Sequence, residues 1–290
     1  MSAFIPWSSQ PLDAWASKHA KGQFIDINGH KTHYIEKGAG EPLILLHGFF
    51  YDSYLWNANI DALAEKFKVY VVDLWGCGYS TRASLDYGYA LYVEQIIGFM
   101  DRLGIENASF LGQSMGGGTA MKLCTEHRDR VNKLLLVDAA GLPNPIPALG
   151  KFFNLPVIGE FFLNLKTDAI RKAGLFGSFI HNKALVSDEY FDNVVRAHKI
   201  ENTATVGLSI QRKQFFDKLS DEIALLAKIE VPILIVWGAQ DKAIPLQVGQ
   251  QLHQLLSGSR FEVLDNAGHV PNFESAAKFN QLAITFLQEP

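Results

Sequence analysis

Five consecutive residues, Gly112-Gln113-Ser114-Met115-Gly116, constrain this chain more than any other stretch. They lie between an apolar run at residues 108–111 and a helical pattern at residues 117–126. Strand, serine turn and helix in that order are typical of a sharp turn that presents the serine hydroxyl at the end of a strand. The two glycines remove side chains that would clash in such a turn. Ser114 is therefore a candidate nucleophile, placed where the first N–H groups of a helix are unpaired.

Strand-like apolar runs alternate with helical patterns along most of the chain. Uninterrupted apolar runs are typical of strands that are buried on both faces of a parallel sheet. The alternation predicts an α/β fold with a mostly parallel, doubly wound sheet. Asn28-Gly29 lies between two alternating segments and predicts a hairpin at an antiparallel edge. The apolar runs are residues 43–46, 69–72, 108–111, 133–137, 232–237 and 260–264.

One long segment interrupts the alternation. More than ninety residues after Val137 contain no strand-like run, and they open with a proline-rich stretch at residues 142–147. An insertion at the carboxyl end of a strand lies where ligands bind in open α/β sheets, so we expect a helical lid. Helical patterns occur around residues 157–165, 188–199 and 205–226. We expect most phenylalanines in the first half of this segment to pack inside the lid and a few to face the cleft. They are Phe152, Phe153, Phe161, Phe162, Phe176 and Phe179.

These boundaries divide the chain into three parts. We predict an N-terminal extension at residues 1–22, a core at residues 23–140 and 228–290, and a helical cap at residues 141–227. Within the extension, the stretch that begins at Pro11 has the pattern of a short helix. We expect the extension to pack against the main body.

Composition excludes several classes of function. The 290 residues are 48% hydrophobic and 19% charged with a net charge of −4, and no basic block suggests a nucleic-acid partner. Cys77 and Cys124 give neither a disulfide framework nor metal-ligand spacing. The apolar runs are too short to span a membrane. Pro6 and Pro11 interrupt the N-terminus, unlike a signal peptide, so we expect a cytoplasmic protein.

A serine nucleophile needs a base within hydrogen-bond reach, and His269 is the best placed of nine histidines. It follows the last predicted strand, so its loop meets the same sheet edge as Ser114. His47 also ends a buried strand, but its loop His47-Gly48-Phe49-Phe50 matches the one that supplies the second N–H group of an oxyanion hole. We therefore assign His47 a structural role and predict the N–H groups of Phe49 and Met115 as oxyanion donors. The other seven histidines lie in the extension, the hairpin, the lid or helices.

The acid that orients the base should lie on another loop at this edge. Asp241 follows the penultimate strand and precedes His269 by 28 residues. Asp138 ends the strand at residues 133–137 and is the alternative, although an acid at a strand end commonly accepts hydrogen bonds from loop N–H groups. We favour Asp241. The order Ser114, Asp241, His269 is the order found in α/β-hydrolases.

With these motifs the chain resembles the α/β-hydrolase superfamily, from about Gly22 to the end. The resemblance rests on His47-Gly48, the glycine-broken loop at residues 73–80, the serine turn, and the loops at 238–241 and 268–271. It implies an eight-stranded, mostly parallel sheet with an inserted helical cap, as in lidded carboxylesterases and carbon–carbon bond hydrolases. Haloalkane dehalogenases and epoxide hydrolases carry aspartate in place of Ser114. Carbon–carbon hydrolases often carry tryptophan after the catalytic histidine, where this chain has Val270.

The combined expectation is a serine hydrolase that cleaves carboxylic esters with short to medium apolar acyl groups through an acyl-enzyme. It implies a small-molecule ester as partner and no metal or organic cofactor, and it leaves a homodimer open. The alternatives are a carbon–carbon bond hydrolase of ring-cleavage products and a receptor-like binder with slow turnover. Fold alone does not separate these functions.

Overall fold

The computed structural model describes residues 4–144, 154–163, 165 and 167–290. These residues form an eight-stranded sheet in the order β1-β2-β4-β3-β5-β6-β7-β8. The pairs β1–β2 and β2–β4 are antiparallel and all the others are parallel, which confirms the predicted fold class. The strands are β1 Gln23–Ile27, β2 His30–Lys37, β3 Pro42–Leu46, β4 Lys68–Val72, β5 Ala108–Gln113, β6 Val131–Val137, β7 Ile233–Gly238 and β8 Arg260–Leu264.

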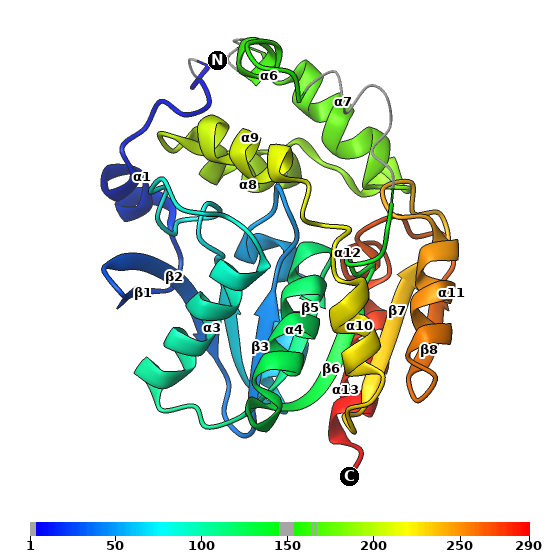
Figure 1. The fold of residues 1–290 in the computed structure, drawn as a ribbon. Coiled ribbons are helices and arrows are strands. Elements are labelled where there is room, and N and C mark those ends of the chain that lie inside the picture. Colours follow the sequence, from blue (N-terminus) through cyan, green and yellow to red (C-terminus); the bar gives the residue numbers. More distant parts are fainter. Residues whose placement is uncertain (1–3, 145–153, 164, 166) are drawn as a thin grey trace.

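Helices cover both faces of the sheet (Figure 1). The helices outside the stretch between β6 and β7 are α1 Leu12–His19, α2 Ile60–Ala64, α3 Tyr89–Leu103, α4 Met115–Glu126, α11 Leu246–Leu255, α12 Pro271–Glu274 and α13 Ala276–Gln288. Alternate residues of one strand enter different cores: Phe110 of β5 packs in one apolar cluster and its neighbour Leu111 in the other. The central strands are therefore apolar on both faces, which explains their uninterrupted runs.

The hairpin between β1 and β2 turns at the predicted dipeptide. Asn28 has φ 52° and Gly29 has φ 80°, which are left-handed conformations that asparagine and glycine adopt readily. Strand β2 then pairs with β4, so the hairpin forms the antiparallel edge of the sheet.

Between β6 and β7 the described residues contain helices and no strand. These are α6 Ile158–Leu163, α7 Ala169–Ser178, α8 Asp188–Arg196, α9 Thr203–Lys213 and α10 Ser220–Leu226, with single 3₁₀ turns at Lys183–Leu185 and Ala197–Lys199. Helices α6 to α9 lie above the carboxyl ends of the strands (Figure 1). Helix α10 instead lies beside α4 and buries Ile223 and Leu226 in the main core.

One pattern predicted as a continuous helix is broken. The pattern at residues 205–226 divides into α9 and α10, and the break begins at Gln214, whose φ of 47° does not occur inside a helix. Apolar spacing reports which face is buried and is insensitive to such a local change of backbone. Helix α7 is not among the helical patterns predicted from the sequence.

The N-terminal extension packs against the segment between β6 and β7. The backbone N–H groups of Ser9 and Gln10 donate to the carbonyl of Lys199, at 2.8 and 2.9 Å. Trp15 of α1 is buried, and its Nε1 donates to the carbonyl of Arg196 at 2.9 Å. The extension therefore holds the region that joins α8 to α9. The predicted helix in this extension runs from Leu12 to His19.

No helix in the described part of the chain is long and apolar enough to cross a membrane.

Candidate active site

Ser114 lies at the turn between β5 and α4 in a conformation that few residues adopt. Its φ is 51° and its ψ is −117°, so the serine is strained and its side chain is presented at the carboxyl end of β5. A Cβ atom on Gly116 would lie 2.3 Å from the carbonyl oxygen of Leu46, and one on Gly112 would lie 2.5 Å from that of Gly116. Both glycines are required by this close packing, as the sequence pattern predicted.

His269 lies after β8 in a loop that is fixed at three points. Its Nδ1 is 2.7 Å from Oδ2 of Asp241. Its backbone N–H donates to Phe179 O at 2.7 Å, and its carbonyl accepts from Nε2 of Gln113 at 2.7 Å. The side chain of His269 is 2% exposed. Because an ionised Asp241 accepts from Nδ1–H, Nε2 of the ring carries the lone pair that could accept a proton.

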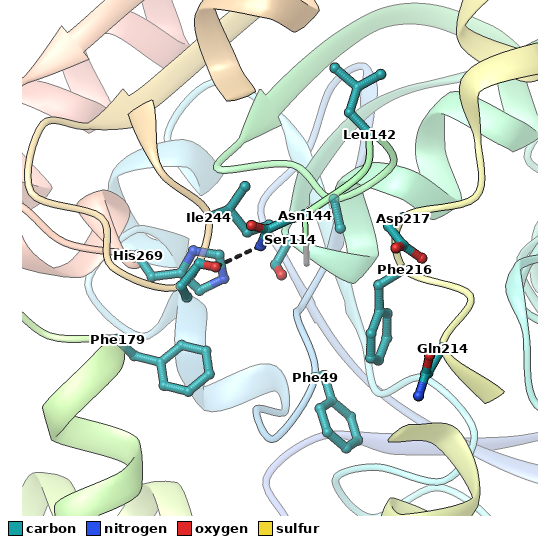
Figure 2. A pocket seen from close by; sticks show the side chains of 12 residues that line it. Phe49, Ser114, Leu142, Asn144, Phe179, Gln214, Phe216, Asp217, Ile244 and His269 are labelled. Carbon is teal, nitrogen blue, oxygen red and sulfur yellow. Dashed lines mark hydrogen bonds between the residues drawn. The ribbon is translucent and has the colours of Figure 1, made fainter. Parts of the chain in front are cut away.

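Ser114 and His269 line the same cavity, and Figure 2 shows the hydroxyl and the ring close together in that view. Within the described residues no hydrogen bond joins Ser114 Oγ to the His269 ring. In enzymes without a bound substrate, such bonds are often long and tighten when the complex forms. The structure thus brings together the predicted nucleophile and base at one sheet edge, with Asp241 behind the base.

Asp241 is oriented by its own loop. Its Oδ1 accepts from the N–H groups of Ala243 and Ile244, at 2.7 and 3.0 Å, which leaves Oδ2 for His269. These three donors hold the carboxylate in one orientation. The alternative acid, Asp138, accepts from the N–H group of Gly238 at 2.9 Å and makes no hydrogen bond to His269.

Both predicted oxyanion donors belong to segments next to Ser114. Met115 is the first residue of α4. Phe49 belongs to the loop that follows β3, and it lines the cavity. Among the described residues no acceptor is bonded to either backbone N–H group. A Cβ atom on Gly48 would lie 3.0 Å from Cβ of Ser114, so glycine allows the loop to approach the serine.

His47 has a structural set of contacts, in line with the role predicted for it. The N–H group of Leu74 donates to its Nε2 at 3.0 Å, so Nδ1 carries the proton, which it donates to Gly48 O at 2.8 Å. Burial lowers the pKa of His47, which keeps the ring neutral. This histidine therefore ties the loop after β3 to the loop after β4.

The cavity beside Ser114 has a volume of about 200 Å³. The rings of Phe49 and Phe216 lie beside each other, and the ring of Phe179 lies apart from them, next to His269 (Figure 2). The other residues that line the cavity are Ala140, Leu142, Asn144, Gln214, Asp217, Ala243 and Ile244. Of the phenylalanines predicted in the first half of the insertion, Phe179 reaches the cavity and Phe161 is 62% exposed. Phe152 and Phe153 lie outside the described residues.

A family model described as the alpha/beta hydrolase fold matches residues 41–276. The match covers the serine turn, the insertion and the loops that carry Asp241 and His269. The chain belongs to the α/β-hydrolase fold family.

This α/β hydrolase is similar to several hydrolases of known name. The 2-hydroxymuconate semialdehyde hydrolase of a Pseudomonas species is 30% identical over 277 residues, which are 92% of this chain and 94% of the relative. A 2-hydroxy-6-oxononadienedioate/2-hydroxy-6-oxononatrienedioate hydrolase of Paraburkholderia phymatum is 31% identical over 276 residues, 89% of this chain and 91% of the relative. A solved meta-cleavage product hydrolase from Pseudomonas fluorescens superposes with a TM-score of 0.77 at 27% identity, covering 92% of this chain and 97% of that one.

Two residues of this α/β hydrolase that support the site were not predicted. Gln113 binds the carbonyl of His269 from the position before Ser114. Glu274 accepts from the N–H group of Gly268 at 2.6 Å with one oxygen and from those of His181 and Asn182 with the other. A glutamine beside the serine lies in the motif itself and could have been noticed. Glu274 carries no sequence signal, because its partners are backbone N–H groups and two of them, on His181 and Asn182, are distant in the chain.

Asp138, Asp241 and His269 are the described acidic and histidine side chains that lie close enough together to share a metal ion. In this structure Nδ1 of His269 is engaged by Asp241. The hydrogen-bonded arrangement fits acid–base chemistry, in which Nδ1 carries a proton.

Proposed function

We propose that this α/β hydrolase is a serine esterase that cleaves carboxylic esters with short to medium apolar acyl groups. Ser114 is the nucleophile, His269 the base and Asp241 the acid that orients it. The backbone N–H groups of Phe49 and Met115 form the oxyanion hole. The observation that carries this proposal is the 2.7 Å hydrogen bond between Asp241 Oδ2 and His269 Nδ1. His269 and Ser114 line the same cavity.

The mechanism follows from these positions. His269 Nε2 accepts the proton of Ser114 as Oγ attacks the ester carbonyl, and Asp241 stabilises the imidazolium that forms. The N–H groups of Phe49 and Met115 stabilise the oxyanion by about 3 kcal/mol each. The alcohol leaves with the proton from His269, and an acyl-enzyme remains on Ser114. His269 then takes a proton from water as the water attacks the acyl-enzyme, and it returns this proton to Ser114 Oγ as the bond to the acyl group breaks and the acid is released.

The lining of the cavity supports an apolar acyl group of modest size. Its described lining residues are mostly apolar and include neither lysine nor arginine. The one ionisable side chain that lines it besides His269 is Asp217, within the described residues. A volume of about 200 Å³ lies below the range of ~300–1,000 Å³ that is usual for ligand pockets.

We assign residues 141–227 to a cap over this cavity, with residues 23–140 and 228–290 as the core and residues 1–22 as an extension. Leu142, Asn144, Phe179 and Phe216 come from the proposed cap and line the cavity. Helix α10, at the end of the cap, returns to the core beside α4. The partner that this arrangement fits is a small molecule.

The test is hydrolysis of p-nitrophenyl acetate, butyrate, octanoate and palmitate by the wild type and by Ser114→Ala. We expect turnover of the acetate and butyrate esters, little of palmitate, and a loss of about 10⁴-fold or more in Ser114→Ala. Activity that survives in Ser114→Ala would overturn the proposal, and so would a wild type that hydrolyses none of the four esters above buffer.

The second candidate is hydrolysis of a carbon–carbon bond in a ring-cleavage product. Its support is that the relatives that are 30% and 31% identical over nearly the whole chain are hydrolases of 2-hydroxymuconate semialdehyde and of 2-hydroxy-6-oxononadienedioate or 2-hydroxy-6-oxononatrienedioate. The names of these substrates describe muconate and dienedioate compounds, which are carboxylates, whereas the described lining of the cavity offers them no cation. A kcat/KM for such a product that exceeds the value for p-nitrophenyl butyrate would favour this candidate over the esterase.

A further inference from the structure

A second aspartate lies behind the proposed triad. Asp138 directly follows β6, is fully buried and adopts a φ of 43°, a positive value that is uncommon in residues other than glycine. One of its carboxylate oxygens, one of Asp241 and a ring nitrogen of His269 all lie within 4.8 Å of one another. Its Oδ1 accepts from Gly238, and its Oδ2 is buried with no hydrogen-bond partner among the described residues. An unpaired buried carboxylate oxygen is costly and requires an explanation.

Two carboxylates so close together in a buried site cannot both be ionised, so one of them holds a proton. Asp241 accepts hydrogen bonds from two backbone N–H groups and from His269, and Asp138 accepts from one backbone N–H group. The negative charge therefore belongs on Asp241 and the proton on Asp138. Burial and the charge of Asp241 raise the pKa of Asp138 well above its ordinary value, and Glu274 adds to this effect.

We propose that Asp138 is a positioning residue of the active site, which keeps a proton beside Asp241 and can itself hold His269 when Asp241 is absent. In the wild type, the O–H group of Asp138 hydrogen-bonds to the carboxylate of Asp241 and fixes it against His269. Without Asp241, no neighbouring charge opposes ionisation of Asp138. Its carboxylate then has the position and the charge to bind Nδ1 of His269. This inference rests on the proposed roles of Ser114, Asp241 and His269.

The choice of variant matters for the test. In Asp241→Asn, the amide oxygen would accept from the N–H groups of Ala243 and Ile244, as Oδ1 does now. Its NH₂ group would then face His269 and impose the wrong tautomer, which alone costs about 10⁴-fold in a triad. Asp241→Ala avoids this effect and leaves space for Asp138 to move. Asp138→Asn retains a hydrogen-bond donor but cannot carry charge.

The experiment measures the rate at which a fluorophosphonate labels Ser114 in the wild type, Asp138→Asn, Asp241→Ala and the double variant. We expect Asp138→Asn to slow labelling by less than about tenfold alone but by at least about 100-fold in the Asp241→Ala background, where it removes the last acid. Asp52→Asn is the matched control, because Asp52 is another buried aspartate, whose pKa burial and Asp73 raise to about 7. It should change labelling by the same factor in both backgrounds.

Equal factors for Asp138→Asn in the two backgrounds would overturn the proposal. Labelling that persists in Ser114→Ala would instead refute the proposed nucleophile, so the two failures are distinguishable. If Asp241→Ala does not fold, infrared difference spectra of the wild type and Asp138→Asn at pH 8 decide the matter. A protonated carboxyl band present only in the wild type supports the proposal, and its absence overturns it.

Discussion

At the scale of single residues, the carboxyl group of Asp138 links the stability of this hydrolase to pH. In the unfolded chain it ionises above its ordinary pKa of 3.8, whereas burial and Asp241 raise its pKa well above that value in the fold. Between the two values the folded state binds more protons, so this group lowers the free energy of unfolding as pH rises. Asparagine at this position cannot ionise, so the substitution removes this decrease in the free energy of unfolding.

We therefore predict that the Tm of Asp138→Asn exceeds that of the wild type, by a difference that grows as pH rises from about 4 to 8. Thermal unfolding across this range, followed by circular dichroism, measures the difference. A difference that is constant with pH would show that Asp138 titrates alike in the folded and unfolded chains.

At the scale of elements, Glu274 of α12 connects the loop that carries His269 to the proposed cap. Its carboxylate accepts three backbone N–H groups, from Gly268 before the histidine and from His181 and Asn182 after α7. Burial raises its pKa in spite of these three hydrogen bonds. The side chain thus holds two loops that are distant in sequence at one place.

Glu274→Gln is expected to lower the free energy of unfolding by about 1–3 kcal/mol, because an amide NH₂ group must face at least one of these backbone donors. It should also slow fluorophosphonate labelling of Ser114, since the histidine loop loses an anchor. Urea unfolding and labelling rates are the measurements. Glu65→Gln, an exposed glutamate on the surface, is the control and should stay within about 0.5 kcal/mol. Equal stabilities for the two variants would contradict the anchoring role.

The N-terminal extension is a second element that holds the proposed cap. Trp15 buries its ring beside Ala197 and Ile200 and donates its Nε1–H group to Arg196 O. We predict that Trp15→Phe costs about 1 kcal/mol through the lost hydrogen bond, and that Trp15→Ala costs about 3–5 kcal/mol through the lost packing. Chemical denaturation of both variants separates the two contributions. Equal losses would mean that the hydrogen bond accounts for the whole effect.

At the scale of the whole molecule, the charge of the cavity should select among substrates. Asp217 comes from the segment between α9 and α10, yet it lines the cavity with Ser114 from the turn after β5 and His269 from the loop after β8 (Figure 2). An anionic substrate must approach this carboxylate, and no lysine or arginine among the described lining residues offsets the repulsion between the two negative charges. The repulsion should weaken with salt, because part of the side chain is exposed.

We predict that Asp217→Asn raises kcat/KM for mono-p-nitrophenyl succinate relative to p-nitrophenyl butyrate by about two- to tenfold at low salt, the effect of a single unit charge at the rim. The preference of Asp217→Asn divided by that of the wild type should fall toward one at 0.5 M sodium chloride, where the Debye length is only about 4 Å. An unchanged preference in Asp217→Asn at low salt would show that Asp217 does not act on the substrate.

The sequence alone determined the fold and the candidate residues, because both depend on local patterns. Apolar runs buried on two faces identified the parallel strands, and Asn28-Gly29 fixed the hairpin. In a parallel sheet the strands end at one edge, so residues placed just after them, such as Ser114, Asp241 and His269, were expected to meet. The motif order then indicated the α/β-hydrolase family.

Only the tertiary structure decided which groups share a proton, a hydrogen bond or a cavity. Asp138 and Asp241 were alternatives in the sequence, and the fold places both beside His269 with one bonded to it. The contacts of Glu274, the lining by Asp217 and the attachment of Trp15 join segments between which no spacing rule operates. Such contacts depend on how loops and helices pack in three dimensions, and that packing is a property of the whole chain rather than of any local pattern.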